Sequence, residues 1–169
     1  MAFCYMIGIS GDYFSGKTLL AEGLAASYSN RTVQVVHMDN YLKVKPNSPC
    51  IDRYTPESYD LEKMQKTVFD IIEQRRCRIL IVEGPFTFAY KPLEELCDIR
   101  VFVECSEEER LRRQSQLKGN DSFSDEYVRR CYTEYIEPSR QEADLFVYSD
   151  ESLEREVWQI RKALRGLFL

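Results

Sequence analysis

Hydrophobic residues occur along the chain in two arrangements that alternate from one end to the other. Short continuous runs, bounded by Gly, Pro or polar residues, are typical of strands buried in a parallel sheet. Longer segments repeat apolar residues every three or four positions, which is the spacing of one helix face. The runs predict strands over 5–10, 32–38, 78–84, 99–105 and 145–148. The spaced segments predict helices over 18–26, 60–76, 91–97, 124–137 and 151–167, and one that opens at 106 and breaks at 118–122.

Because strands and helices alternate throughout, we expect an α/β fold with a parallel sheet of about five strands and helices on both faces. Pro92 suits the first turn of its helix, and Pro138 should stop the helix that begins near 124. Three helices carry clear apolar faces. Their predicted inward residues are Leu20, Leu24 and Tyr28; Leu61, Met64, Val68, Phe69, Ile71 and Ile72; and Leu153, Val157, Ile160 and Leu164.

Composition limits the class of protein. A chain of 169 residues with 44% apolar content suits one domain, over 1–169, with its own core. A net charge of −5 argues against a nucleic-acid polymer as partner, though not against a nucleotide. Six scattered cysteines and the single His37 indicate a reduced, cytoplasmic protein without a His/Cys metal site. We find no secretory signal and no apolar run of the roughly 20 residues that crossing a membrane needs.

Residues 11–18 are the most informative stretch, because they match the phosphate-binding pattern of Gly, four residues, Gly-Lys-Thr in full. A predicted strand precedes them and a predicted helix follows, which places the phosphates of a nucleotide at a helix N-terminus. We expect a three-layer α/β/α fold of the P-loop NTPase type. Lys17 would reach the β- and γ-phosphates and Thr18 would hold Mg²⁺. The predicted nucleotide-binding residues are Gly11, Asp12, Tyr13, Phe14, Ser15, Gly16, Lys17 and Thr18.

Two carboxylates end predicted strands, at the sheet edge where ligands bind in open α/β folds. Asp39 follows the second strand and could accept a proton from a hydroxyl that attacks the γ-phosphate; a turn cap is the alternative. Glu83 ends the third strand and could anchor Mg²⁺, often through water; a strand-end cap is the alternative.

Two further segments are candidates for binding. The irregular stretch 43–59 carries Asp52, Arg53, Tyr54 and Tyr59, which could hold a sugar and a ring or be a solvated loop. Ser106 opens a helix with a capping box that Glu109 completes. That helix carries Arg110, Arg112 and Arg113, then Lys118. The segment 106–122 is predicted as a short lid that neutralises the transferring phosphate, with a charged solvated face as the alternative.

Taken together, these motifs resemble the uridine kinase and nicotinamide riboside kinase family of P-loop nucleoside kinases over nearly the whole chain. The markers are 11–18, 38–41, 54–60, 81–84, 101–103 leading to 112–113, and 135–139 with 143–144. The resemblance implies transfer of the γ-phosphoryl group of ATP to a nucleoside 5′-hydroxyl, with Mg²⁺. It implies phosphate binding by Lys17, proton acceptance by Asp39, a metal site at Thr18 and Glu83, and lid roles for Arg112 and Arg113.

The acceptor is harder to assign from the sequence. Residues 88–93 resemble nicotinamide riboside kinases, and the chain lacks an insert near 77 that uridine kinases carry. Phe123 stands close to an aromatic that nicotinamide riboside kinases stack on a flat ring. The region 135–144 is more like uridine kinases. We therefore predict nicotinamide riboside as acceptor, with Tyr41, Asp52, Tyr54 and Phe123 in the substrate site.

Two departures from the family keep alternatives open. Gln114–Lys118 lacks a further arginine, and Tyr54 stands where a sugar-binding aspartate is expected, with Asp52 two residues earlier. Uridine or cytidine phosphorylation is the first alternative. A nucleotide-binding regulatory protein with a weakened kinase site is the second. A GTPase is disfavoured because we find no guanine-reading Asn-Lys-x-Asp segment.

Overall fold

The computed structural model describes residues 4–28, 33–43, 52–117, 123–149 and 151–165. Within them, five strands form one sheet in the order β2-β3-β1-β4-β5, and every neighbouring pair is parallel. The strands are β1 (Tyr5–Gly11), β2 (Val33–His37), β3 (Ile79–Glu83), β4 (Ile99–Glu104) and β5 (Leu145–Tyr148). The predicted parallel α/β sheet is therefore confirmed.

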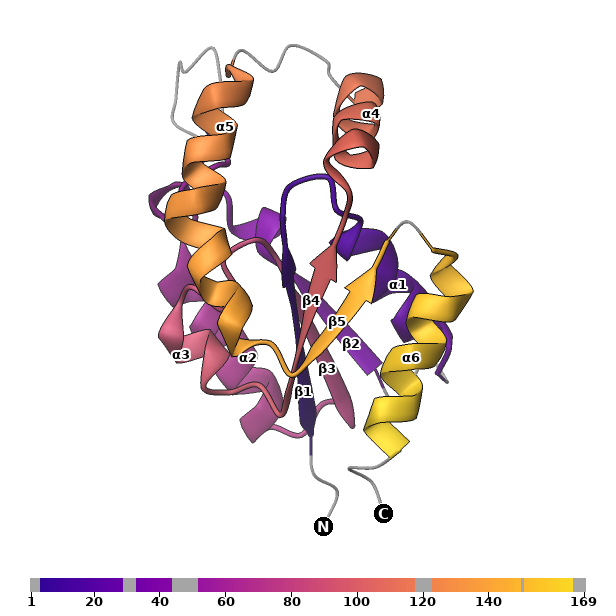
Figure 1. Cartoon of the computed structure of the whole chain (residues 1–169). Helices are drawn as coiled ribbons and strands as arrows, with labels where there is room; N and C mark the ends of the chain where they lie inside the picture. The colour runs from indigo at the N-terminus through magenta and orange to yellow at the C-terminus, as the bar shows by residue number, and fades with distance from the viewer. Residues whose placement is uncertain (1–3, 29–32, 44–51, 118–122, 150, 166–169) are drawn as a thin grey trace.

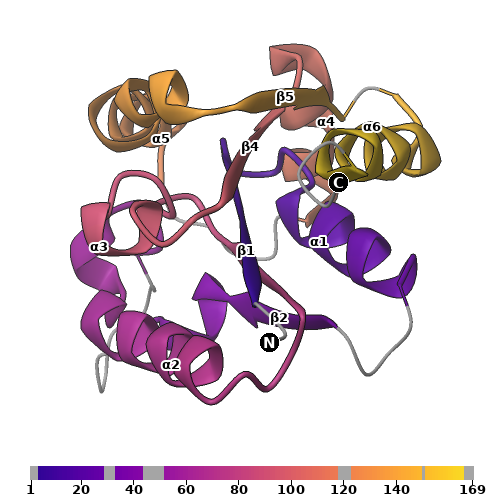
Figure 2. The ribbon, with the colours of Figure 1, turned by 90° about the horizontal axis from the view of Figure 1, so that it is seen from below.

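Helices cover both faces of the sheet, as Figure 2 shows from below. On one face lie α1 (Lys17–Ala26) and α6 (Leu153–Arg165); on the other lie α2 (Leu61–Glu73), α3 (Lys91–Glu94) and α5 (Asp125–Cys131). Each face has its own buried cluster. Leu20, Leu24 and Ile160 pack on the first, while Met64, Val68 and Phe86 pack on the second. This is the expected three-layer α/β/α arrangement.

The central strands are buried because both of their faces meet helices. β1 lies between β3 and β4, and its residues from Met6 to Gly11 are all buried. The carboxyl ends of the strands meet at one edge, from which α4 (Glu107–Leu117) and α5 project (Figure 1). The chain also forms two short 3₁₀ turns between β2 and α2, at Met38–Tyr41 and Pro56–Ser58. The edge is where the candidate residues gather.

Several sequence predictions about helices need correction. Phe69 was expected to face inward but is 52% exposed, because the buried face of α2 runs through Leu61, Met64, Val68 and Ile71, and Phe69 is turned about 100° from Val68. The helix over 91–97 is a single turn, α3.

Pro138 was expected to end the helix that begins near 124, and this prediction is wrong. α5 continues into a π-helical turn (Tyr132–Ile136) and then a 3₁₀ turn (Glu137–Glu142), so the chain stays helical across the proline. Pro138 is accommodated in the first turn of the 3₁₀ segment, where a missing N–H breaks no required bond.

Some predictions fall outside the described residues: the break at 118–122, residues 44–51 of the loop over 43–59, Cys50 and the last residues of the terminal helix. The cysteines that the structure describes are all free thiols. No helix in the described part of the chain is long and apolar enough to cross a membrane.

Candidate active site

The phosphate-binding loop connects the central strand β1 to α1. Its path requires left-handed backbone at Gly11 (φ 148°), Phe14 (φ 61°) and Gly16 (φ 94°). Glycine adopts such angles without strain, and a Cβ on Gly11 would lie 2.5 Å from the carbonyl oxygen of Val103. Nζ of Lys17 donates to the carbonyl oxygen of Asp12 at 2.6 Å, so the ammonium group lies inside the turn of the loop.

The chemistry of the loop residues suits a bound polyphosphate. The hydroxyl of Ser15 is fully buried and has no hydrogen-bond partner among the described residues. The first turn of α1 contains no acidic residue and begins at the loop, so its N–H groups and dipole favour an anion. Burial lowers the pKa of the Lys17 ammonium, against the opposing effect of Glu83 and Asp12. A bound phosphate would supply the negative charge that this buried cation needs.

A carboxylate lies directly beneath the loop. Glu83, at the end of β3, is 3% exposed, and its Oε1 accepts from Oγ1 of Thr18 at 3.3 Å. The same oxygen lies 2.8 Å from Nδ1 of His37, at the end of β2. Thr18 and Glu83 are therefore together, as the sequence predicted. A hydroxyl and a carboxylate beside a phosphate loop are the ligand types that Mg²⁺ prefers, so the pair fits that ion.

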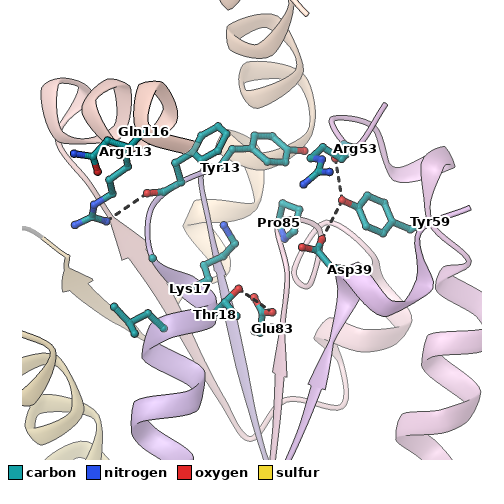
Figure 3. Close-up of a pocket in the computed structure, with 13 residues that line it drawn as sticks. Tyr13, Lys17, Thr18, Asp39, Arg53, Tyr59, Glu83, Pro85, Arg113 and Gln116 are labelled. Carbon is teal, nitrogen blue, oxygen red and sulfur yellow. Dashed lines mark hydrogen bonds between the residues drawn. The ribbon is translucent and has the colours of Figure 1, made fainter. Parts of the chain in front are cut away.

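Asp39 lies on the opposite side of the cleft from the loop, in the turn that follows β2 (Figure 3). Its carboxylate is exposed, and Oδ1 is 3.5 Å from the hydroxyl of Tyr59. The Tyr59 hydroxyl also donates to the carbonyl oxygen of Arg53 at 3.0 Å. Tyr59 is 2% exposed, and burial together with the Asp39 charge raises its pKa, so it is a fixed neutral donor.

These groups line one cleft of about 430 Å³. Of the predicted site residues, it is lined by Tyr13, Phe14, Gly16, Lys17, Thr18, Asp39, Glu83 and Arg113. Leu19, Arg53, Tyr59, Pro85 and Gln116 complete the lining. The predicted catalytic carboxylate, the loop lysine and the metal-binding pair thus share a single cavity that is open to solvent.

The other predicted substrate residues lie outside this lining. Tyr54 is fully buried, with its ring edge-on to Tyr13 at 4.6 Å and to Phe123 at 5.5 Å between centroids. Phe123 stacks on Tyr127 at 5.1 Å. Asp52 accepts from the Tyr127 hydroxyl at 2.6 Å and from the backbone N of Tyr54 at 2.9 Å. Tyr41 packs against the core cluster under α2. A role for these four in substrate binding stays a prediction.

The lid arginines have different surroundings. Arg113 donates to the carbonyl oxygen of Phe14 at 3.3 Å and to that of Ser149 at 2.8 Å, which ties α4 to the phosphate loop. Arg110 pairs with the Asp12 carboxylate at 3.2 Å. Arg112 is 56% exposed and pairs with Glu109 within α4, away from the residues that line the cleft.

Half of the predicted capping box is present. The hydroxyl of Ser106 accepts from the backbone N of Glu109 at 3.3 Å. The Glu109 carboxylate bonds instead to Arg112 and Arg113, and these two side-chain bonds lower its pKa to about 2.

Sequence reasoning gave no role to two residues that the geometry brings into the site, His37 and Gln116. It named Tyr59 as a possible sugar or ring contact but not as the neighbour of Asp39. The signal for His37 was its place two residues before Asp39, at the carboxyl end of a strand. Gln116 follows Arg113 by one helical turn and so shares its face.

Known proteins of similar sequence are named as kinases. No family model matches the chain. A uridine kinase from Chlamydia pneumoniae is 27% identical over 187 aligned residues, which cover 89% of this chain and 84% of the relative. A uridine kinase from Lactococcus lactis is 25% identical, with coverage of 84% and 86%. The chain is thus similar in sequence to uridine kinases over most of its length.

Solved structures share the fold of this chain. A possible uridine kinase from Bacillus stearothermophilus superposes with a TM-score of 0.57 at 19% identity, covering 86% of this chain and 89% of the other. A shikimate kinase from Bacteroides thetaiotaomicron gives a TM-score of 0.68 at 15% identity, with coverage of 95% and 98%. The fold is thus shared among P-loop kinases that are distant in sequence.

Proposed function

We propose that the protein transfers the γ-phosphoryl group of ATP to a hydroxyl group of a nucleoside. The observation that carries this proposal is the single cleft in which the carboxylate of Asp39 lies across from Lys17, Thr18 and Glu83. Such a placement leaves room for a hydroxyl between the carboxylate and a phosphate held by the loop. The uridine kinases of similar sequence support a nucleoside as the acceptor.

The chemistry follows from the positions of these residues. Asp39 accepts the proton of the acceptor hydroxyl as its oxygen forms a bond to the γ-phosphorus, and ADP leaves as the bond to the β-phosphate oxygen breaks. The Tyr59 hydroxyl lies beside the Asp39 carboxylate, 3.5 Å from its Oδ1. Lys17 and Arg113 stabilise charge on the transferred group. Thr18 and Glu83 would hold Mg²⁺, which neutralises charge on the phosphates when it is bound.

A pyrimidine nucleoside is favoured over nicotinamide riboside, which the sequence resemblance had put first. The relatives of similar sequence are uridine kinases. In addition, the Phe123 ring, assigned to stacking on a flat base, stacks on Tyr127 and does not line the cleft. An aromatic that is already stacked within the protein offers less surface to a substrate.

The proposal is tested by an ADP-release assay with ATP and Mg²⁺, offering uridine, cytidine and nicotinamide riboside separately, with product mass confirmed. We expect a nucleoside monophosphate from at least one pyrimidine nucleoside, at a higher kcat/KM than from nicotinamide riboside. Turnover on nicotinamide riboside alone would reverse the ranking of acceptors. ATP binding without any phosphorylated product would support the alternative of a nucleotide-binding regulatory protein.

A further inference from the structure

We propose that the preferred acceptor carries an anionic group, a carboxylate or a phosphate, which the guanidinium group of Arg53 binds beside Asp39. This inference rests on the phosphoryl transfer proposed above and refines the chemical class of its acceptor. Its basis is that Arg53 is a cation that lines the cleft and does not belong to the phosphate-binding loop.

The backbone around Arg53 is fixed on both sides. The Tyr59 hydroxyl donates to the Arg53 carbonyl oxygen at 3.0 Å, and Tyr59 itself is buried. The next residue, Tyr54, is fully buried, and its backbone N donates to the Asp52 carboxylate at 2.9 Å. Arg53 itself is exposed to solvent, although its backbone is held against the core.

Arg53 lies where an acceptor has to bind. The Tyr59 hydroxyl donates to the Arg53 carbonyl oxygen and lies 3.5 Å from Oδ1 of Asp39, so Arg53 and the proposed base lie beside the same hydroxyl group. Figure 3 shows the nitrogen atoms of Arg53 on the cleft side, above Pro85 and Asp39. The other cations that line the cleft, Lys17 and Arg113, belong to the phosphate loop and to the helix that contacts it.

The same segment offers little to a neutral sugar. Tyr54 is buried in the aromatic cluster, and the Asp52 carboxylate is occupied by the Tyr127 hydroxyl at 2.6 Å. Neither residue lines the cleft, whereas Arg53 does. The polar group that this segment presents to an acceptor is therefore a guanidinium rather than a carboxylate.

A guanidinium at this place favours an anion for a physical reason. An acceptor that fills the cleft removes water from Arg53, and a charge that loses water without gaining a partner is costly. A carboxylate or phosphate on the acceptor supplies two parallel N–H···O bonds to the planar guanidinium. A charge-assisted bond of this kind contributes roughly 1.5–3 kcal/mol, which corresponds to about 10- to 100-fold in binding.

The test compares three acceptors that share the pyrimidine and the 5′-hydroxyl: uridine, 6-carboxyuridine and uridine 3′-phosphate. The carboxylate and phosphate arms distinguish the two sources of negative charge. Each is assayed with the wild-type protein, with Arg53→Gln and with Arg155→Gln. Arg155 is a matched control because its side chain is 65% exposed on α6 and pairs with Glu151, four residues earlier in the chain.

We expect at least one charged acceptor to exceed uridine by about 10- to 100-fold in kcat/KM. Arg53→Gln should bring kcat/KM for the charged acceptor down to that for uridine in the same variant, with the KM for ATP within about threefold of the wild type. Arg155→Gln should leave the advantage of the charged acceptor in place. The inference is wrong if uridine matches both charged acceptors. It is also wrong if Arg53→Gln slows all three equally and raises the KM for ATP, because Arg53 would then bind the donor.

If none of the three acceptors is phosphorylated, the proposed transfer to nucleosides is wrong, and the anion site at Arg53 is tested by binding alone. The inference is then decided by calorimetry with 6-carboxyuridine and uridine 3′-phosphate in the presence of ADP. Binding that Arg53→Gln weakens by about tenfold or more supports an anion site at Arg53. Binding that the substitution leaves unchanged, or no binding at all, contradicts it.

Discussion

Nδ1 of His37 lies 2.8 Å from Oε1 of Glu83, so the only histidine of the sequence contacts the carboxylate beneath the phosphate-binding loop. Glu83 is 3% exposed and its Oε1 also accepts from Thr18. A buried carboxylate needs such hydrogen-bond donors to offset its loss of water. The imidazole therefore holds Glu83 in the orientation in which it faces Thr18, and we regard His37 as a positioning residue for this pair, which we propose as the metal site.

Replacing His37 should weaken the effect of Mg²⁺ on nucleotide binding. His37→Ala removes a donor to a buried carboxylate, which costs roughly 1–3 kcal/mol. We therefore expect the factor by which Mg²⁺ raises ADP affinity to be at least about fivefold smaller in His37→Ala than in the wild type. His37→Asn keeps an N–H donor and should restore part of the enhancement. Calorimetry with and without Mg²⁺ measures this directly. Equal enhancement in the wild type and His37→Ala would remove His37 from the site.

Gly84 should not tolerate a side chain. A Cβ at this position would lie 2.4 Å from Cβ of Met38 and 2.8 Å from its Sδ, directly between Glu83 and the turn that carries Asp39. We expect Gly84→Ala to lower the free energy of unfolding by about 1–3 kcal/mol, as overpacking does, and to reduce the transfer rate. Urea denaturation measures the first effect.

Gly23→Ala is the matched control for that substitution. Its Cβ would approach only the flexible side chain of Leu153, at 3.0–3.2 Å, and alanine favours a helix interior such as that of α1. A loss of stability in Gly23→Ala as large as in Gly84→Ala would show that the contact with Met38 is not the cause.

Glu156 should make stability depend on pH. It is 5% exposed on α6, and burial raises the pKa of its carboxyl from 4.5 to about 7. The folded protein therefore binds this proton more tightly than the unfolded chain does. The stability it provides is complete below about pH 4.5 and is lost as the pH rises through about 7.

We expect Glu156→Gln, which stays neutral, to lose less thermal stability between pH 5 and pH 8 than the wild type. Thermal unfolding at matched ionic strength measures the difference. Glu154→Gln on the same helix is the control, because Glu154 is exposed. The interpretation would be contradicted if Glu154→Gln and Glu156→Gln changed the pH dependence equally.

Much of the fold follows from local patterns. The strand runs predicted all five strands within two residues of their ends, because buried parallel strands are continuously apolar. Phe69 was misplaced because it is apolar and adjacent to an inward position, and hydrophobicity alone does not report its exposure. Pro138 was misread because a proline inside a 3₁₀ turn looks, in sequence, like a proline that ends a helix.

The candidate site was predictable only in part. That Lys17, Thr18, Asp39 and Glu83 lie around one cleft could be predicted, because each stands at the carboxyl end of a strand or in a motif with a fixed backbone path. Burial of Tyr54, by contrast, depends on contacts with Tyr13 and Phe123.

The orientation of Arg53 into the cleft depends on its neighbours in the same way. It follows from the hydrogen bond between its carbonyl oxygen and Tyr59 and from the burial of Tyr54. Such contacts between a loop and the core are set by packing and have no periodic signal in the sequence.

The central claim is that Asp39 takes the proton from the acceptor hydroxyl in this cleft. Single-turnover transfer from ATP to uridine, with ATP affinity measured in parallel, tests it in the wild type and in Asp39→Ala. We predict ATP affinity within about threefold of the wild type and a transfer rate lower by about 10²- to 10⁴-fold, because a positioned base contributes that much. An Asp39→Ala protein that binds ATP and transfers the phosphoryl group at the wild-type rate would contradict this account.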